Sequence, residues 1–403
     1  MKWEKVKLGE LYEVHNGLSK AGKFFGEGYP FLTFSTVFNN YFIPKQITDL
    51  VQSTEKEQES YSIRRGDVFV TRTSETSDEL GMSCVALKDY PMATYNGFTK
   101  RMRPITNRVF PEYIGYYMRL PSFRGEFRAF STMTTRASLR NEDLLGLEVK
   151  LPSIEIQKQI ADILSAYDDL IENNQKQIKL LEEAAQRLYK EWFVDLRFPG
   201  HENTKIVDGV PEGWNICPFS SKVDIMSGGT PKTSIPDYYN GRIPFYTPKD
   251  SDGAFFAYKT QMNITEGGLK NCNSRLYPPK TVIITARGTV GKTTILAVPM
   301  AMNQSCYALK MKENDAPYYL FFALNNEIKA LQTMANGGVF NTIIGKTFDS
   351  INIQIPKDPL IYGFEETVRP FMEQIKNKLQ ANSKIVEARD RLLPKLMSGE
   401  VEV

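Results

Sequence analysis

Two short segments combine a basic side chain with small polar residues directly after an apolar, β-branched run. Arg72-Thr73-Ser74 follows Asp67 to Thr71, and Arg287-Gly288-Thr289 follows Val282 to Thr285. An arginine at a strand end can form two hydrogen bonds to a guanine, and a Ser or Thr hydroxyl can meet a base or a phosphate. The alternative for each segment is a turn whose hydroxyl or glycine only shapes the backbone. These residue types favour nucleic-acid contact and leave the structural alternative open.

Further basic and polar residues extend this candidate set. From Phe98 to Arg140, nine Lys or Arg residues stand against two Glu residues, and aromatic residues are interleaved with them. A local excess of basic residues is typical of a surface that meets phosphates. A solvated helix face above an aromatic core would give the same pattern. The candidate DNA contacts are Lys20, Arg72, Thr73, Ser74, Lys100, Arg136, Thr230, Lys232, Lys249, Arg287, Lys292 and Asn303.

Signals for catalysis are weak. Residues Ala286 to Thr293 resemble a loosened phosphate loop, but the strand-like run that follows offers no helix N-terminus for a phosphate. His15 and His201 are the only histidines and neither belongs to a ligand cluster, which disfavours a zinc site or a histidine triad. The four cysteines show no C-x-x-C pair, so we expect reduced thiols. The sequence indicates a binding protein without an active site, metal or cofactor of its own.

Length and composition set the broad class. The 403 residues allow two to three domains, and the net charge of +3 is too small to indicate a nucleic-acid partner by itself. The N-terminal segment has no apolar run typical of a signal peptide, and no segment reaches the roughly 20 apolar residues of a membrane span. We therefore expect a soluble cytoplasmic protein without a membrane partner.

The elements that must position these residues occur twice. The segment that begins at Trp3 is echoed from Trp214, and Tyr29-Pro30-Phe31 recurs as Ile243-Pro244-Phe245. Val149-Lys150-Leu151-Pro152 likewise recurs as Ile353-Gln354-Ile355-Pro356. A period of about 200 residues is the size of a domain and far too long for a solenoid repeat. The duplication predicts two similar binding domains and a ligand of two parts.

A long helix is predicted after each domain. Apolar residues at alternating spacings of four and three indicate a coiled-coil seam. The first seam includes Ile160, Leu164, Tyr167, Ile171, Ile178, Leu181 and Leu188, and the second includes Phe364, Val368, Phe371, Ile375, Ile385, Leu392 and Leu396. Asn174 falls in the first seam, where a buried polar residue can fix the register; an exposed position in a water-filled stretch is the alternative.

These patterns predict an α+β fold in which two mixed, strand-rich domains are separated by two long helices. The helices would form an antiparallel coiled coil with pseudo-two-fold symmetry. The predicted strands include 29–37, 67–71, 83–87, 282–285 and 294–298, and a helix is predicted over 317–331. The expected division is domain 1 at 1–152, a spacer helix at 153–192, a linker at 193–213, domain 2 at 214–357, and a second spacer helix with its tail at 358–403.

Several motifs resemble one known family. They are Leu151 to Leu164, Leu188 to Glu202, Val210 to Trp214 and Leu392 to Val401, together with Ser227 to Pro231 and the Ala286-Arg287-Gly288 hairpin. The whole chain resembles a specificity subunit of a type I restriction–modification system. Only the start of the second helix, Ile355 to Val368, departs from the family pattern.

The resemblance implies a function in DNA methylation and phage defence. By this resemblance, each strand-rich domain would be a target-recognition domain that reads one half of a split, asymmetric site in double-stranded DNA. The helices would dock two modification subunits, which carry S-adenosylmethionine and methylate adenine. Restriction motor–nuclease subunits, which use ATP and Mg²⁺, would add cleavage. The chain itself would be non-catalytic and would hold no cofactor.

Three other functions remain open from the sequence. The chain would also suit a related type IIB or orphan adenine-methyltransferase system. An ATP-using enzyme built on residues 286–293 would bind radiolabelled ATP. A coiled-coil scaffold without nucleic acid would fail to shift random duplex DNA at low salt.

Overall fold

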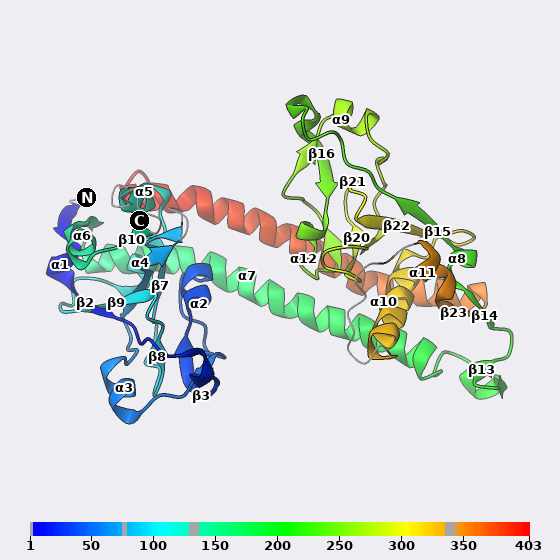
Figure 1. Ribbon diagram of the computed structural model, residues 1–403, viewed down its shortest axis with the longest axis horizontal. Helices are drawn as coiled ribbons and strands as arrows, with labels where there is room; N and C mark the ends of the chain where they lie inside the picture. The colour runs from blue at the N-terminus through cyan, green and yellow to red at the C-terminus, as the bar shows by residue number, and fades with distance from the viewer. Residues whose placement is uncertain (1–2, 75–78, 129–136, 335–342, 344) are drawn as a thin grey trace. The chain divides into compact units, whose positions relative to one another are not determined.

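The structure, a computed structural model, describes residues 3–74, 79–128, 137–334, 343 and 345–403 (Figure 1). The chain divides into two compact units: unit 1 comprises Met1–Ile171 and Ile385–Val403, and unit 2 comprises Glu172–Lys384. Two long helices, α7 (Ile154–Tyr189) and α12 (Asp358–Ser398), each contribute residues to both units. Segments that are distant in the sequence therefore share each unit's core.

Unit 1 is built on an antiparallel sheet with the strand order β2-β9-β5-β7. These strands are β2 (Tyr12–Asn16), β9 (Thr99–Pro104), β5 (Val68–Thr71) and β7 (Ser83–Val85). All four residues of β5 are buried, as a continuous apolar run predicts for an inner strand. A second sheet has the order β4-β3-β8, with β4 (Leu50–Val51), β3 (Phe25–Leu32) and β8 (Thr94–Tyr95).

Shorter elements complete unit 1. The paired strands are β1 (Glu4–Lys7) with β11 (Glu148–Leu151), and β6 (Thr73–Ser74) with β10 (Ala137–Ser138). The helices are α1 (Leu8–Leu11), α2 (Phe34–Asn39), α3 (Glu55–Ser60), α4 (Pro111–Tyr117), α5 (Pro121–Arg128) and α6 (Asn141–Gly146).

Unit 2 repeats this plan, and its strand β17 (Phe256–Ala257) stands where unit 1 has an isolated parallel bridge between Phe42 and Val85. Its main sheet has the order β15-β22-β19-β20-β17, and its second sheet has the order β18-β16-β21. The strands are β15 (Val223–Ser227), β22 (Cys306–Met311), β19 (Val282–Thr285), β20 (Thr293–Leu296), β17 (Phe256–Ala257), β18 (Asn263–Ile264), β16 (Tyr239–Tyr246) and β21 (Ala301–Met302). β14 (Asn215–Pro218) pairs with β23 (Asn352–Ile355), as β1 pairs with β11 in unit 1. The predicted duplication thus extends to the strand order.

The helices and connections of unit 2 follow the same order along the chain. They include α8 (Phe219–Lys222), α9 (Glu266–Lys270), α10 (Pro317–Met334) and α11 (Gly345–Ser350). After α7 comes a π-helical turn at Lys190–Val194 and a small hairpin of β12 (Ile206–Val207) and β13 (Val210–Pro211).

Within each unit, the segments of the two long helices pack against each other, and they run antiparallel, as expected. In unit 2, Asn174 Nδ2 donates to Asn382 Oδ1 at 2.8 Å, and the Tyr189 ring lies 5.9 Å from the Phe364 ring. In unit 1, Arg389 of α12 is paired with Asp168 of α7 at 2.5 Å. The apolar seam residues are all buried or half-buried, and all of them except Tyr167, Ile171 and Ile385 belong to the hydrophobic core of their own unit.

The prediction of a strand from Tyr29 to Val37 is wrong for its second half. The residue types from Tyr29 to Val37 predict a single strand, but β3 ends at Leu32 and α2 begins at Phe34. Thr33 separates them because its side-chain oxygen accepts a hydrogen bond from Thr36 N at 3.3 Å. This N-cap starts a helix although the residues after it are apolar and β-branched.

None of the helices within the described ranges is both long and apolar enough to cross a lipid bilayer.

Candidate nucleic-acid interface

Four connections of unit 2 meet beyond the ends of its strands, and together they form the unit 2 loop cluster: residues 228–232, 247–250, 286–292 and 303–305. Asn303 N donates to Tyr246 O at 3.0 Å, and Ala286 N donates to Ser305 O at 2.7 Å. Thr289 Oγ1 donates to Pro248 O at 3.3 Å, and the Thr230 hydroxyl bonds to the Gln304 side chain. The fold therefore brings together Thr230, Lys232, Lys249, Arg287, Lys292 and Asn303, which lie up to 73 positions apart in the sequence.

Close backbone packing holds these loops in place. A Cβ atom at Gly228 would lie 2.2 Å from the carbonyl oxygen of Asn303, so only glycine fits. Thr247 and Asp250 form a capping box, in which Thr247 N donates to Asp250 Oδ2 at 2.8 Å. The 286–292 hairpin turns through two glycines with positive φ, Gly288 and Gly291. The loops are thus shaped before any ligand binds.

The side chains on this frame are cationic and open to solvent. Lys232, Lys249, Arg287 and Lys292 are all exposed, and across the part of unit 2 that the structure describes none of them forms an ion pair. Asn303 is half-buried, and its side-chain oxygen accepts a hydrogen bond from Ser305 N at 3.0 Å. Unneutralised cations on rigid loops suit contact with phosphates or with guanine edges.

Unit 1 carries the corresponding cluster, defined as residues 17–20, 33–36, 71–74 and 96–98. Its main-chain bonds match those of unit 2. Asn96 N donates to Leu32 O at 3.0 Å, Arg72 N donates to Phe98 O at 3.0 Å, and Leu18 N donates to Tyr95 O at 2.8 Å. In unit 2 the matching bonds involve Asn303, Ala286 and Gly229. Arg72 therefore occupies the place of Ala286, and Arg287 is displaced by one residue.

The predicted contacts of unit 1 all stay predictions, and those that the structure describes have different surroundings. Lys20 is paired with Glu57 at 2.8 Å, and only 14% of its side chain is exposed. Lys100 is 5% exposed and bonds to the side chain of Asn141, and burial lowers the pKa of its ammonium group. Arg136 lies outside the described residues. Thr73 and Ser74 form β6, directly after Arg72.

Several arginines between Phe98 and Arg140 form hydrogen bonds or ion pairs within unit 1. Arg119 donates to the carbonyl oxygens of Ser83 at 2.7 Å, Phe38 at 3.0 Å, Val37 at 2.8 Å and Asn40 at 2.7 Å. Arg103 is paired with the buried Asp67 at 2.6 Å, and this hydrogen bond raises the pKa of its guanidinium. The local excess of positive charge is therefore partly a structural feature.

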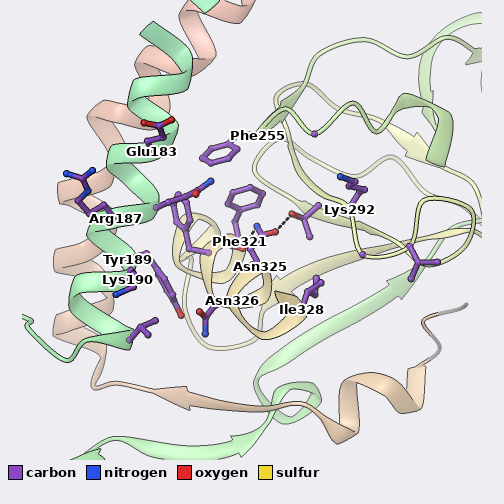
Figure 2. A pocket seen from close by; sticks show the side chains of 17 residues that line it. Glu183, Arg187, Tyr189, Lys190, Phe255, Lys292, Phe321, Asn325, Asn326 and Ile328 are labelled. Carbon is purple, nitrogen blue, oxygen red and sulfur yellow. Dashed lines mark hydrogen bonds between the residues drawn. The ribbon is translucent and has the colours of Figure 1, made fainter. Parts of the chain in front are cut away.

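A groove of about 770 Å³ lies beside the hairpin of unit 2 (Figure 2). Phe255 and Phe321 lie in it with ring centroids 4.9 Å apart, and Lys292 lies at its edge. Thr293, the first residue of β20, donates from Oγ1 to Asn325 Oδ1 at 2.7 Å. In unit 1 the equivalent strand is β7, and the carbonyl oxygen of its first residue, Ser83, accepts a hydrogen bond from Arg119. This wall of the groove is thus one place where the two units differ.

The phosphate-loop pattern at Ala286 to Thr293 is a hairpin between two strands. β19 ends at Thr285, and β20 begins at Thr293, so a strand follows the loop. A phosphate loop requires a helix there, whose N-terminal amides meet the phosphate. The geometry favours a loop that presents Arg287 and Lys292 over a nucleotide site.

Known proteins are similar to this chain in sequence and in fold. The family described as type I restriction modification DNA specificity domain matches residues 1–183 and 211–381. The MjaIX type I restriction enzyme specificity subunit of Methanocaldococcus jannaschii is 26% identical over 412 residues, which cover 100% of this chain and 94% of the relative. The HindI specificity subunit of Haemophilus influenzae is 24% identical over 468 residues, which cover 99% of both chains.

One solved structure supports the fold. The type I restriction–modification S subunit from M. genitalium aligns with a TM-score of 0.58 at 16% sequence identity, covering 98% of this chain and 96% of that one. At this identity the match bears on the fold alone. Because the family match spans most of both halves and the relatives align over the full length, the chain belongs to the specificity subunits of type I restriction–modification systems.

Proposed function

We propose that this chain reads a two-part, asymmetric site in double-stranded DNA, with one half-site for each loop cluster. The supporting observation is that the clusters share their main-chain hydrogen bonds while their side chains differ, as at Arg72 and Ala286. A common frame would approach the DNA backbone in the same way in both units. Different side chains on that frame would select different bases.

Methylation and cleavage of the DNA would be carried out by partner subunits in the cytoplasm. Two modification subunits would bind S-adenosylmethionine and methylate adenine, and motor–nuclease subunits would use ATP and Mg²⁺. Outside the paired seam, Leu170 and Leu180 of α7 are 47% and 64% exposed. Exposed leucines on a helix suit docking of another helix, so we assign contacts with the modification subunits to these two positions, each within its own unit.

Methylation-site sequencing of a host with and without this gene tests the proposal. We expect an adenine-methylated motif with two specified halves of different sequence, which disappears when the gene is deleted. A continuous palindromic motif, or a methylome that does not change on deletion, would contradict it. The comparison works whatever the target bases are, because sequencing reads every methylated site in the genome.

A further inference from the structure

Phe98 is a large apolar side chain whose exposure the fold does not explain. It lies in the unit 1 loop cluster, between β8 and β9, and it is 60% exposed. The aromatic residues that follow it in the sequence, such as Tyr113, Phe123 and Phe127, are buried. An exposed phenylalanine forgoes the stabilisation that burial of its side chain would contribute.

The turn that carries Phe98 is held by hydrogen bonds on each side. Phe98 N donates to Asn96 Oδ1 at 2.7 Å, and Phe98 O accepts from Arg72 N at 3.0 Å. Gly97 N donates to Leu18 O at 2.8 Å, and a Cβ atom at Gly97 would lie 2.2 Å from Ser19 Oγ. The aromatic ring is therefore presented from a fixed backbone, which lowers the entropy lost when it binds.

Unit 2 builds the same turn without an aromatic residue. Ser305 takes the place of Phe98: its amide donates to Asn303 Oδ1 at 3.0 Å, and its carbonyl accepts from Ala286 N at 2.7 Å. Ser305 is half-buried. Since the backbone bonds persist with serine, the turn does not need the ring. The aromatic side chain must contribute something other than the fold.

We propose that Phe98 contacts the bases of the half-site that unit 1 reads, through its apolar ring. Phenylalanine contacts the methyl group of thymine, and apolar side chains also insert between base steps. Arg72, bonded to the same turn, would supply the neighbouring polar contact. This inference rests on the proposed function and adds a base-contacting residue that unit 2 lacks.

The test uses the full chain assembled with its modification subunit. The probes are a duplex bearing the motif identified by methylation sequencing and a random duplex of equal length. We expect Phe98→Ala and Phe98→Ser to weaken binding to the motif roughly tenfold, with little change on random duplex. Ile105→Ala is the matched control, because Ile105 is 58% exposed but follows the opposite end of β9. It should change neither affinity.

Two further measurements identify the contact. Replacing thymidine by deoxyuridine in one half-site should weaken the wild-type complex but not Phe98→Ala if the ring meets a methyl group. A rise in 2-aminopurine fluorescence that Phe98→Ala abolishes would show insertion between bases. Unchanged discrimination in Phe98→Ala, while the wild type discriminates, would overturn this inference alone. A wild-type complex that does not discriminate would overturn the proposed function as well.

Discussion

At the scale of single residues, arginine side chains have different roles in the two units. Arg119 lies inside unit 1 and binds four carbonyl oxygens, whereas Arg287 lies in an exposed hairpin without an ion pair among the described residues. A count of basic residues cannot distinguish them, because burial depends on contacts between distant segments. The charge pattern from Phe98 to Arg140 therefore overstated the cationic surface of unit 1.

The structural role of Arg119 predicts a loss of stability when it is shortened. Arg119→Ala would leave four carbonyl groups without this donor, and we expect the free energy of unfolding to fall by roughly 3 kcal/mol. Urea unfolding at neutral pH measures it. Arg140→Ala is the control, since the Arg140 side chain is 75% exposed and pairs with Asp143, three residues along the chain; the unfolding midpoint of this variant should not change. A wild-type midpoint for Arg119→Ala would rule out the structural role.

At the scale of elements, the long helices follow from the sequence, and their partners follow from the fold. The alternating spacing of apolar residues predicted both helices and their facing sides, yet α12 continues through Pro370 and Pro394. Proline removes a backbone donor and disfavours a helix interior. The buried residues Phe364, Val368 and Leu396 show that packing against each unit's core holds the helix through these positions.

The Asn174–Asn382 pair predicts a coupling between the two helices. Asn174→Leu or Asn382→Leu alone places a leucine against an amide, whereas the double substitution restores two matched apolar side chains. We expect the double variant to be more stable than either single variant, with a coupling energy on the order of 1 kcal/mol. A double-mutant cycle from urea unfolding measures this energy. Simple additivity of the two single effects would show that the observed bond does not fix the pairing.

At the scale of the whole molecule, the duplication repeats a backbone and varies its side chains. Both units share the order of four main-sheet strands and matching loop bonds, but the side chains on the loops differ, as at Arg72 and Ala286 and at Phe98 and Ser305. The hydrogen bonds that both units form join main-chain atoms, so they can persist when the side chains change. The side chains around them are therefore free to diverge, as two different half-sites would require.

This arrangement predicts separable effects on the two halves of the DNA motif. In a host that expresses the complete methyltransferase, Arg72→Ala should relax the specified bases in one half, and Arg287→Ala should relax them in the other. Each lost guanine contact is worth roughly 1–3 kcal/mol of discrimination. Methylation-site sequencing of both variant hosts detects the change. If both variants relaxed the same half, the assignment of one half-site to each unit would be wrong.

The duplication could be predicted because segments of the chain recur, and the two long helices and most inner strands could be predicted because they depend on local spacing of apolar residues. β5 and β19 lie within their predicted ranges for this reason. The break at Thr33 was missed because a single side-chain hydrogen bond started a helix within an apolar run. The spacing of apolar residues carries no information about a single side-chain hydrogen bond of this kind.

Only the tertiary structure decided which polar residues come together and which are available to a ligand. Lys232, Lys249 and Arg287 belong to one loop cluster because strands that are distant in the sequence end side by side. Lys100 and Arg119 became internal, and Phe98 was left exposed, through contacts that no spacing encodes. Burial depends on contacts across the folded chain. The sequence therefore indicated which residues could bind a ligand, and the fold showed which of them are exposed.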